Sequence, residues 1–122
     1  MHMDATVTLQ VLKDQVKRFC EERDWDQFHS PKDLAIGVVT EAAELLEPFR
    51  FKSEQDTRSL LENPKTREHV SEELADVLYF LLRLCQMYGI DLSDAFERKM
   101  KRNAEKYPVE KSRGVNKKYT EL

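Results

Sequence analysis

Residues 71–85 read SEELADVLYFLLRLC, and the spacing of their apolar side chains predicts a long α-helix. At ~3.6 residues per turn, the apolar residues gather into one stripe around Leu74. Glu73 and Asp76 lie at the border of that stripe. A helix of this kind buries its stripe against a neighbour and places both carboxyl groups at the edge of the contact.

An earlier stretch, residues 37–47, reads GVVTEAAELLE and repeats this arrangement. Its apolar stripe is centred on Ala42, and Glu41 and Glu44 occupy the bordering positions. If the two helices pack antiparallel through their stripes, four carboxylates converge on one spot. Such a cluster is tolerable only when it is protonated or bridged by cations, and hard divalent metal ions prefer oxygen ligands. The pattern therefore indicates a metal site, although two acid-edged faces that never meet would show the same pattern.

Length and composition favour a single helical domain. The chain has 122 residues, of which 40% are hydrophobic and 35% charged, and only 3 are glycine. A net charge of -3 is too balanced for a general binder of nucleic acids or membrane surfaces. We find no signal-peptide pattern and no apolar run near the roughly 20 residues of a transmembrane helix. We therefore expect a cytoplasmic protein with Cys20 and Cys85 as buried, reduced thiols.

Helix-start and helix-stop residues divide the chain. Ser30-Pro31 and Asn63-Pro64 each supply a capping side chain followed by a proline at the first helical position. Gly89 is suited to end the helix that begins at the second of these pairs. Residues 53–62 are expected to form a linker turn with only a short helical tendency. The expected helices span residues 7–23, 30–47, 63–88 and about 91–108.

Four further positions bear on ligand binding. Gly37 lies one turn before Glu41, at a cost of roughly 1 kcal/mol relative to alanine, which close approach of a ligand or another helix would explain. Lys99 and Asn103, one turn apart, are suited to bind phosphate oxygens, although a solvated surface gives the same pattern. Trp25 is expected either to fill the core or to stack on a ligand.

The donor types favour magnesium or manganese. Carboxylates without an ExxH motif argue against a di-iron centre. Magnesium that keeps several waters is normally completed by substrate phosphates. The sequence has no P-loop, glycine-rich cradle or Ser/His/Asp constellation. Phosphate chemistry in this chain would therefore have to be led by a metal.

Three motifs, taken in order, resemble the signature of a known family: Glu41-x-x-Glu44, Glu73-x-x-Asp76 and Lys99-x-x-x-Asn103. They are similar to those of the all-α nucleoside triphosphate pyrophosphohydrolases, the MazG-like superfamily. Residues 23–29, 99–108 and 118–122 are similar to the dCTP pyrophosphatase branch. The resemblance implies an all-α bundle of four to five helices that assembles as a homodimer or homotetramer. We expect the domain to span residues 4–108, after a possible expression scar at residues 1–3 and before a polar tail at 109–122.

The resemblance also implies the reaction, which is hydrolysis of a nucleoside triphosphate to the monophosphate and pyrophosphate with Mg²⁺, or Mn²⁺ as a substitute. The implied metal ligands are Glu41, Glu44, Glu73 and Asp76. Glu44 is our first choice for the general base, and Lys99 and Asn103 would contact phosphates. The residues implied to contact base or sugar are Trp25, His29, Phe51 and Phe80. Phe51 and Phe80 stand where the branch has tryptophan and tyrosine. The preference for a base or sugar is therefore the family property that is least safely carried over to this chain.

Two alternatives remain beside an enzyme that controls the dCTP pool. One is an enzyme of the same kind that clears modified or non-canonical nucleotides. The other is a helical interaction module whose acids are only surface charge. The module predicts neither turnover nor stabilisation by magnesium.

Overall fold

The computed structural model describes residues 2–122, and these form helices with no strand among them. The expected all-α fold is confirmed. Met1, part of the expected expression scar, lies outside the described residues. The α-helices are α1 (Leu9–Glu22), α2 (Pro31–Leu46), α3 (Glu54–Glu62), α4 (Pro64–Met87), α5 (Leu92–Lys106) and α6 (Val109–Ser112). Short 3-10 helices are η1 (Met3–Ala5), η2 (Asp26–Phe28), η3 (Glu47–Phe49) and η4 (Tyr119–Glu121). No helix in residues 2–122 is long and apolar enough to cross a membrane.

Side-chain caps start the main helices as the sequence predicts. The hydroxyl oxygen of Ser30 accepts a hydrogen bond from the backbone N–H of Asp33 at 3.1 Å. The Oδ1 atom of Asn63 accepts one from the N–H of Lys65 at 2.9 Å. These caps satisfy amide groups that have no partner within the helix. Gly89 follows α4 with φ of 67°, in the left-handed region that favours glycine.

The expected linker turn at residues 53–62 is wrong, because this segment forms the nine-residue helix α3. Ser53 caps it by accepting a hydrogen bond from the N–H of Asp56 at 3.1 Å. Glu54 and Asp56 place negative charge in its first turn, where the helix dipole is favourable to anions. The apolar spacing of this segment indicates a helix only weakly, and the cap and the acidic first turn stabilise it.

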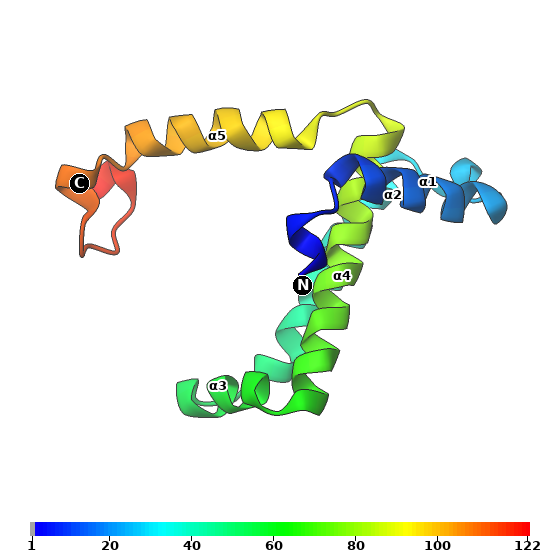
Figure 1. Ribbon diagram of the computed structural model, residues 1–122. Helices are drawn as coiled ribbons and strands as arrows, with labels where there is room; N and C mark the ends of the chain where they lie inside the picture. Colours follow the sequence, from blue (N-terminus) through cyan, green and yellow to red (C-terminus); the bar gives the residue numbers. More distant parts are fainter. Residues whose placement is uncertain (1) are drawn as a thin grey trace. The chain divides into compact units, whose positions relative to one another are not determined.

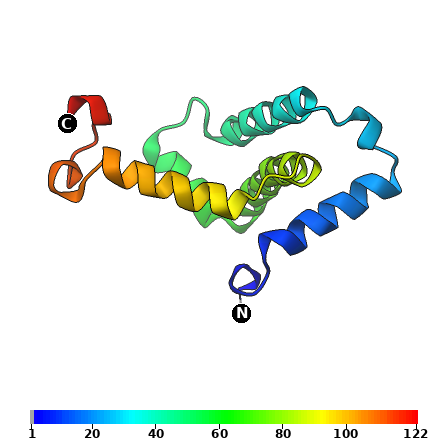
Figure 2. The same ribbon diagram turned by 90° about the horizontal axis from the view of Figure 1, so that it is seen from above.

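The chain divides between Gly89 and Ile90 into two compact units. In the first unit α4 is the central helix, and α2 runs antiparallel beside it (Figure 1). Helices α1 and α3 also pack on α4. Seen from above, α4 is viewed nearly along its axis with α2 on one side (Figure 2). The antiparallel arrangement assumed from the two apolar stripes is therefore present.

The core between α1 and α4 is built from side chains on the apolar faces of the two helices. Val16, Cys20 and Leu82 are buried, and Leu9, Leu12, Leu78 and Tyr79 pack around them. The Sγ atom of Cys20 lies 3.1 Å from the hydroxyl oxygen of Tyr79. Both cysteines are free and buried, as expected.

Gly37 is explained by a neighbouring helix. A Cβ atom at this position would lie 2.8 Å from Cγ of Phe80, closer than side chains pack. The glycine therefore lets the Phe80 ring of α4 lie against the backbone of α2. Of the two explanations left open by the sequence, close approach of another helix is the one that the structure shows.

Part of the predicted apolar stripes remains uncovered within the chain. Val39 is 70% exposed, Leu46 is 56% exposed and Leu74, the centre of one predicted stripe, is 53% exposed. Beside them is an apolar hollow of about 500 Å³ lined by Ala42, Leu45, Leu46, Phe49, Leu61, Val70 and Leu74. The expectation that the stripes bury each other is thus only partly correct.

The second unit contains α5, α6 and η4. Asp91 caps α5 by accepting a hydrogen bond from the N–H of Asp94 at 3.0 Å. The tail returns to the end of this helix, where the rings of Tyr107 and Tyr119 lie 6.0 Å apart at 82°. Lys106 places its ammonium group 4.9 Å from the centre of the Tyr119 ring. The polar tail is therefore held to α5 by aromatic contacts.

Candidate metal and nucleotide site

Three of the four predicted acids come together where α2 and α4 pack. Glu41 on α2 and Glu73 and Asp76 on α4 each offer an oxygen atom, and these atoms lie within 4.8 Å of one another. Acids three positions apart share a helix face, and the antiparallel packing brings the two faces together. Glu44 lies one turn further along α2 and is exposed.

Two of these carboxyl groups are partly buried, and each has one oxygen atom that is fully buried. Among the described residues, the Oε2 atoms of Glu41 and Glu73 are buried and have no hydrogen-bond partner. Burial raises the pKa of Glu41, and so do a hydrogen bond and charge interaction with Glu44. Burial and the charge of Glu44 likewise raise the pKa of Glu73. A hydrogen bond between two carboxyl groups needs a proton on one of them, so two carboxylates here would only repel.

His69 lies beside Glu73 on the α4 side. Its Nε2 atom lies 3.9 Å from Oε1 of Glu73, one helical turn away. The other oxygen of Glu73 has no partner in the part of the chain that the structure describes. Buried carboxylate oxygens without donors are costly unless a cation binds them. Three oxygen ligands of this kind fit a hard divalent metal ion such as Mg²⁺ or Mn²⁺.

Lys99 and Asn103 lie on α5, in the second unit. Lys99 is exposed, and Asn103 is partly buried. The amide Nδ2 of Asn103 lies 3.9 Å from the sulfur of Met100, which is a weak acceptor. Both polar groups therefore have hydrogen-bonding capacity left for a ligand such as phosphate.

Trp25 and His29 flank η2, between α1 and α2. Trp25 is 38% exposed, and its ring lies 5.6 Å from Phe19 at 74°. The ring of His29 lies 6.3 Å from that of Trp25 at 65°. Trp25 thus packs on the end of α1 and still presents part of its surface to solvent, and its stacking on a ligand stays a prediction.

Phe51 and Phe80 have opposite environments. Phe51 is 96% exposed and has a φ of 61°, a backbone conformation costing a non-glycine residue roughly 1–2 kcal/mol. The guanidinium of Arg50 lies 4.8 Å from the centre of its ring. Phe80 is partly buried, against Gly37 and against Tyr79 at a ring distance of 5.0 Å. Phe51 is available to a ligand, whereas Phe80 also has a packing role.

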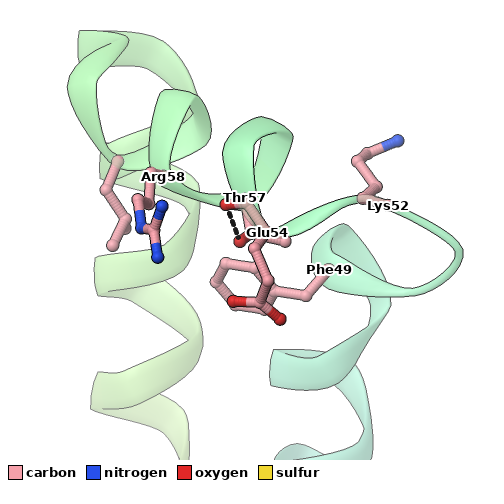
Figure 3. A pocket seen from close by; sticks show the side chains of 6 residues that line it. Phe49, Lys52, Glu54, Thr57 and Arg58 are labelled. Atoms are coloured by element: carbon pink, nitrogen blue, oxygen red, sulfur yellow. Dashed lines mark hydrogen bonds between the residues drawn. The ribbon is translucent and has the colours of Figure 1, made fainter.

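A hollow of about 300 Å³ lies between η3 and α3. In Figure 3 the Glu54 side chain overlaps the Phe49 ring, and the Lys52 side chain points away from both. Thr57 donates a hydrogen bond to the backbone carbonyl of Glu54 at 2.8 Å. The remaining lining residues are Arg58 and Leu61.

Sequence reasoning missed Arg83. Its side chain is 1% exposed and lies in α4 among apolar neighbours. Nε donates to Nδ1 of His29 at 3.0 Å, and the side chain also forms an ion pair with Asp26. An arginine between leucines in an apolar stretch, LLRLC, was the available signal, because a buried cation needs partners.

A model of the MazG-like family matches residues 36–122, which is more than half of the chain and includes all four acids, Lys99 and Asn103. The chain belongs to the MazG-like family. The resemblance inferred from the three motifs is therefore confirmed.

Relatives of this MazG-like chain include dCTP pyrophosphatase 1 of Rattus norvegicus, which is 41% identical over 115 residues. The same protein of Homo sapiens is 37% identical over 115 residues. Both alignments cover 94% of this chain and 68% of the relative. A solved structure of a pyrophosphatase from Archaeoglobus fulgidus matches with a TM-score of 0.76 and 40% identity. That match covers 82% of this chain and 92% of the other, so the shared fold extends over most of both.

Proposed function

We propose that this MazG-like enzyme hydrolyses nucleoside triphosphates to the monophosphate and pyrophosphate, with Mg²⁺ as the metal and Mn²⁺ as a substitute. dCTP, or a closely related deoxynucleotide, is the proposed substrate. The observation that carries the proposal is the cluster of Glu41, Glu73 and Asp76, in which two buried oxygen atoms lack partners among the residues that the structure describes. Similarity to dCTP pyrophosphatase 1 over 94% of the chain supports the choice of substrate.

The acids have separate proposed roles. Glu41, Glu73 and Asp76 hold the metal, with Glu44 completing the ligand set at its exposed edge. When bound, the metal neutralises the triphosphate and makes the attacking water more acidic. Glu44 interacts with both Glu41 and Glu73 and, unlike Glu41, is exposed, so it is placed to accept the proton from that water.

The remaining residues are proposed to bind the nucleotide. Lys99 supplies a positive charge and Asn103 an amide group for phosphate oxygens. Trp25, His29 and Phe51 contact the base or sugar, and Phe51 offers a fully exposed ring held on a strained backbone. The partly buried Phe80 contributes an edge of its ring in addition to its packing on Gly37.

A second copy of the chain is proposed to cover the apolar hollow beside Leu46 and Leu74. The two leucines are 56% and 53% exposed, and the hollow of about 500 Å³ is lined almost entirely by carbon. A face of this composition is more typical of a subunit interface than of a solvated surface. The proposed assembly is a homodimer or a homotetramer built from dimers.

We place the enzyme in the cytoplasm, where nucleotide pools are controlled and free thiols stay reduced.

The test is pyrophosphate release from a panel of ribo-, deoxy- and modified nucleoside triphosphates, with Mg²⁺ and with a chelator. Glu44→Gln removes a charge with little change in shape, and it should lower kcat by about 10²- to 10⁴-fold while the protein stays folded. Glu72→Gln is the matched control, because Glu72 is an exposed acid adjacent to the cluster on α4. Its kcat should stay within about twofold of the wild type.

The panel also separates the alternatives. Preference for a modified nucleotide over dCTP would assign the enzyme to clearing such nucleotides. If no nucleotide is turned over and Mg²⁺ leaves the melting temperature unchanged, the interaction module would replace the enzyme.

A further inference from the structure

Arg83 is a buried cation that α4 places against the loop containing Trp25 and His29. All three nitrogens of its guanidinium are used. Nε donates to Nδ1 of His29 at 3.0 Å, one Nη donates to Oε1 of Gln86 at 2.6 Å, and the other pairs with Asp26. Asp26 opens η2 and His29 follows its end, so one side chain holds both ends of this turn.

The contact with His29 also determines where the imidazole carries its proton. Arginine has no acceptor and keeps its charge, so its Nε–H must donate and Nδ1 of His29 must present a lone pair. The neutral ring then carries its proton on Nε2. Protonation of Nδ1 would set two donors against each other at 3.0 Å. The guanidinium therefore selects one tautomer.

A second contact holds the backbone of His29. The hydroxyl of Tyr88, at the end of α4, donates to the backbone carbonyl of His29 at 2.8 Å. The backbone and the ring of His29 are thus held by two residues of the same helix. His29 is only partly buried, so the ring can still meet a ligand.

We propose that Arg83 is a positioning residue for nucleotide recognition, which holds His29 as the Nε2–H tautomer so that the ring meets the substrate as a hydrogen-bond donor. The inference rests on the proposed function, in which His29 contacts the nucleotide. A neutral donor recognises an acceptor, such as the carbonyl oxygen of a pyrimidine or a sugar oxygen. It discriminates against a base that offers an amino group at the same place, because two donors then face each other.

The charges around His29 favour its neutral form. Burial lowers the pKa of His29, and the positive charge of Arg83 lowers it further. Asp26 on η2 and Asp33 on α2 act in the opposite direction without reversing the shift. The ring is therefore neutral near pH 7. Acidification protonates Nδ1, breaks the contact with Arg83 and should raise KM.

The test combines imidazole ¹⁵N spectra with steady-state kinetics of the full chain and Mg²⁺-dCTP. In the wild type, the spectra should show Nδ1 without a proton and Nε2 with one. Arg83→Met keeps the bulk of the side chain and removes its donors. It should mix the tautomers, shift the His29 pKa toward its ordinary value of 6.5 and raise KM about three- to tenfold, with a smaller change in kcat.

Two further variants separate positioning from mere structural support. Asp26→Asn weakens the ion pair with Arg83 but leaves the Nε contact to His29, so it should lower the melting temperature with little change in KM. In a His29→Phe background, Arg83→Met should produce no further rise in KM, because the residue through which it acts is already absent.

A wild-type spectrum with the proton on Nδ1 would overturn the proposal, even if Arg83→Met failed to fold. So would an Arg83→Met enzyme with unchanged KM, or one whose KM rises equally with and without His29. Absence of turnover by the wild type would instead overturn the proposed function, and the spectra would still decide the tautomer.

Discussion

The acids at the centre of the proposed site work against the stability of the metal-free chain. Glu41 and Glu73 each bury an oxygen atom that has no hydrogen-bond partner within residues 2–122, and Asp76 lies close to both. Each carboxylate loses hydration and gains like-charged neighbours. A divalent cation removes both costs at once, since it supplies the missing ligand for each oxygen and neutralises the repulsion. Folding stability and catalysis therefore oppose each other at these positions.

Neutralising one of these acids should stabilise the metal-free protein. In the presence of a chelator, we expect Glu73→Gln to melt at a higher temperature than the wild type, because the amide removes a charge and adds a donor within the cluster. Thermal unfolding monitored by circular dichroism measures the difference. Added Mg²⁺ should raise the melting temperature of the wild type more than that of the variant. A metal-free variant that melts below the wild type would show that the acids do not repel in the folded state.

His29 should make stability depend on pH in the opposite direction to a histidine whose pKa is raised on folding by an acidic partner. Its pKa is lowered on folding, by burial first and by Arg83 second, so the folded state prefers the neutral ring. The contribution to stability is full above the ordinary pKa of 6.5 and is lost as pH falls below it. Chemical denaturation at pH 8 and pH 5.5 should show a larger loss for the wild type than for His29→Gln. Equal losses in both proteins would contradict the lowered pKa.

At the scale of the elements, the close packing of α2 on α4 depends on a missing side chain. Gly37 allows the Phe80 ring to lie against the α2 backbone, within the same pair of helices that carries the acids. A glycine inside a helix costs roughly 1 kcal/mol relative to alanine. The packing that it allows has to outweigh that cost, and it also fixes the position of a ring proposed to contact the nucleotide.

Gly37→Ala should therefore destabilise the protein despite the better helix propensity of alanine. The new methyl group would meet the Phe80 ring, and overpacking typically costs ~1–3 kcal/mol against a propensity gain of roughly 1 kcal/mol. We expect a net loss of up to about 2 kcal/mol in the free energy of unfolding, measured by urea denaturation. The double variant Gly37→Ala/Phe80→Leu should recover part of that loss. A single variant as stable as the wild type would mean that Phe80 can move aside freely.

At the scale of the whole molecule, the uncovered apolar residues indicate that one chain is an incomplete unit. Val39, Leu46 and Leu74 are all more than half exposed, although they belong to the stripes around which the helices are organised. Complete burial of a fully exposed side chain of this size is worth roughly 1.5–3 kcal/mol, and more than half of that burial is still available at each of the three. A second chain packed against this face would gain that free energy.

Leu46→Lys should weaken the proposed assembly by placing a charge in the apolar hollow. We expect a shift toward a smaller species at micromolar concentration, measured by light scattering after size-exclusion chromatography. Val11→Lys is the matched control, because Val11 is 53% exposed on α1, outside the hollow. A wild type that is already monomeric, or an unchanged Leu46→Lys assembly, would contradict the proposed interface.

Most of the helices, their caps, the acidic pairs and the family could be predicted from the sequence alone. Each depends on residues that lie near one another along the chain, such as Ser30 with Asp33 or Glu73 with Asp76. A helix places residues three or four positions apart on one face whatever its surroundings are. Family motifs have the same local character, so they too are visible without coordinates. Helix α3 was not predicted because its apolar residues show no strong helical periodicity, although the residue that caps it, Ser53, could be seen in the sequence.

Only the tertiary structure decided which local features meet. It brought Glu41 to Glu73 and Asp76, placed Phe80 on Gly37, and left Leu74 uncovered where a buried stripe was expected. It also paired Arg83 with His29, which is 54 positions away in the sequence. Spacing along a chain specifies the face of a helix but not the partner of that face. The partner depends on burial and on hydrogen-bond geometry between distant segments, and these exist only after the helices have packed.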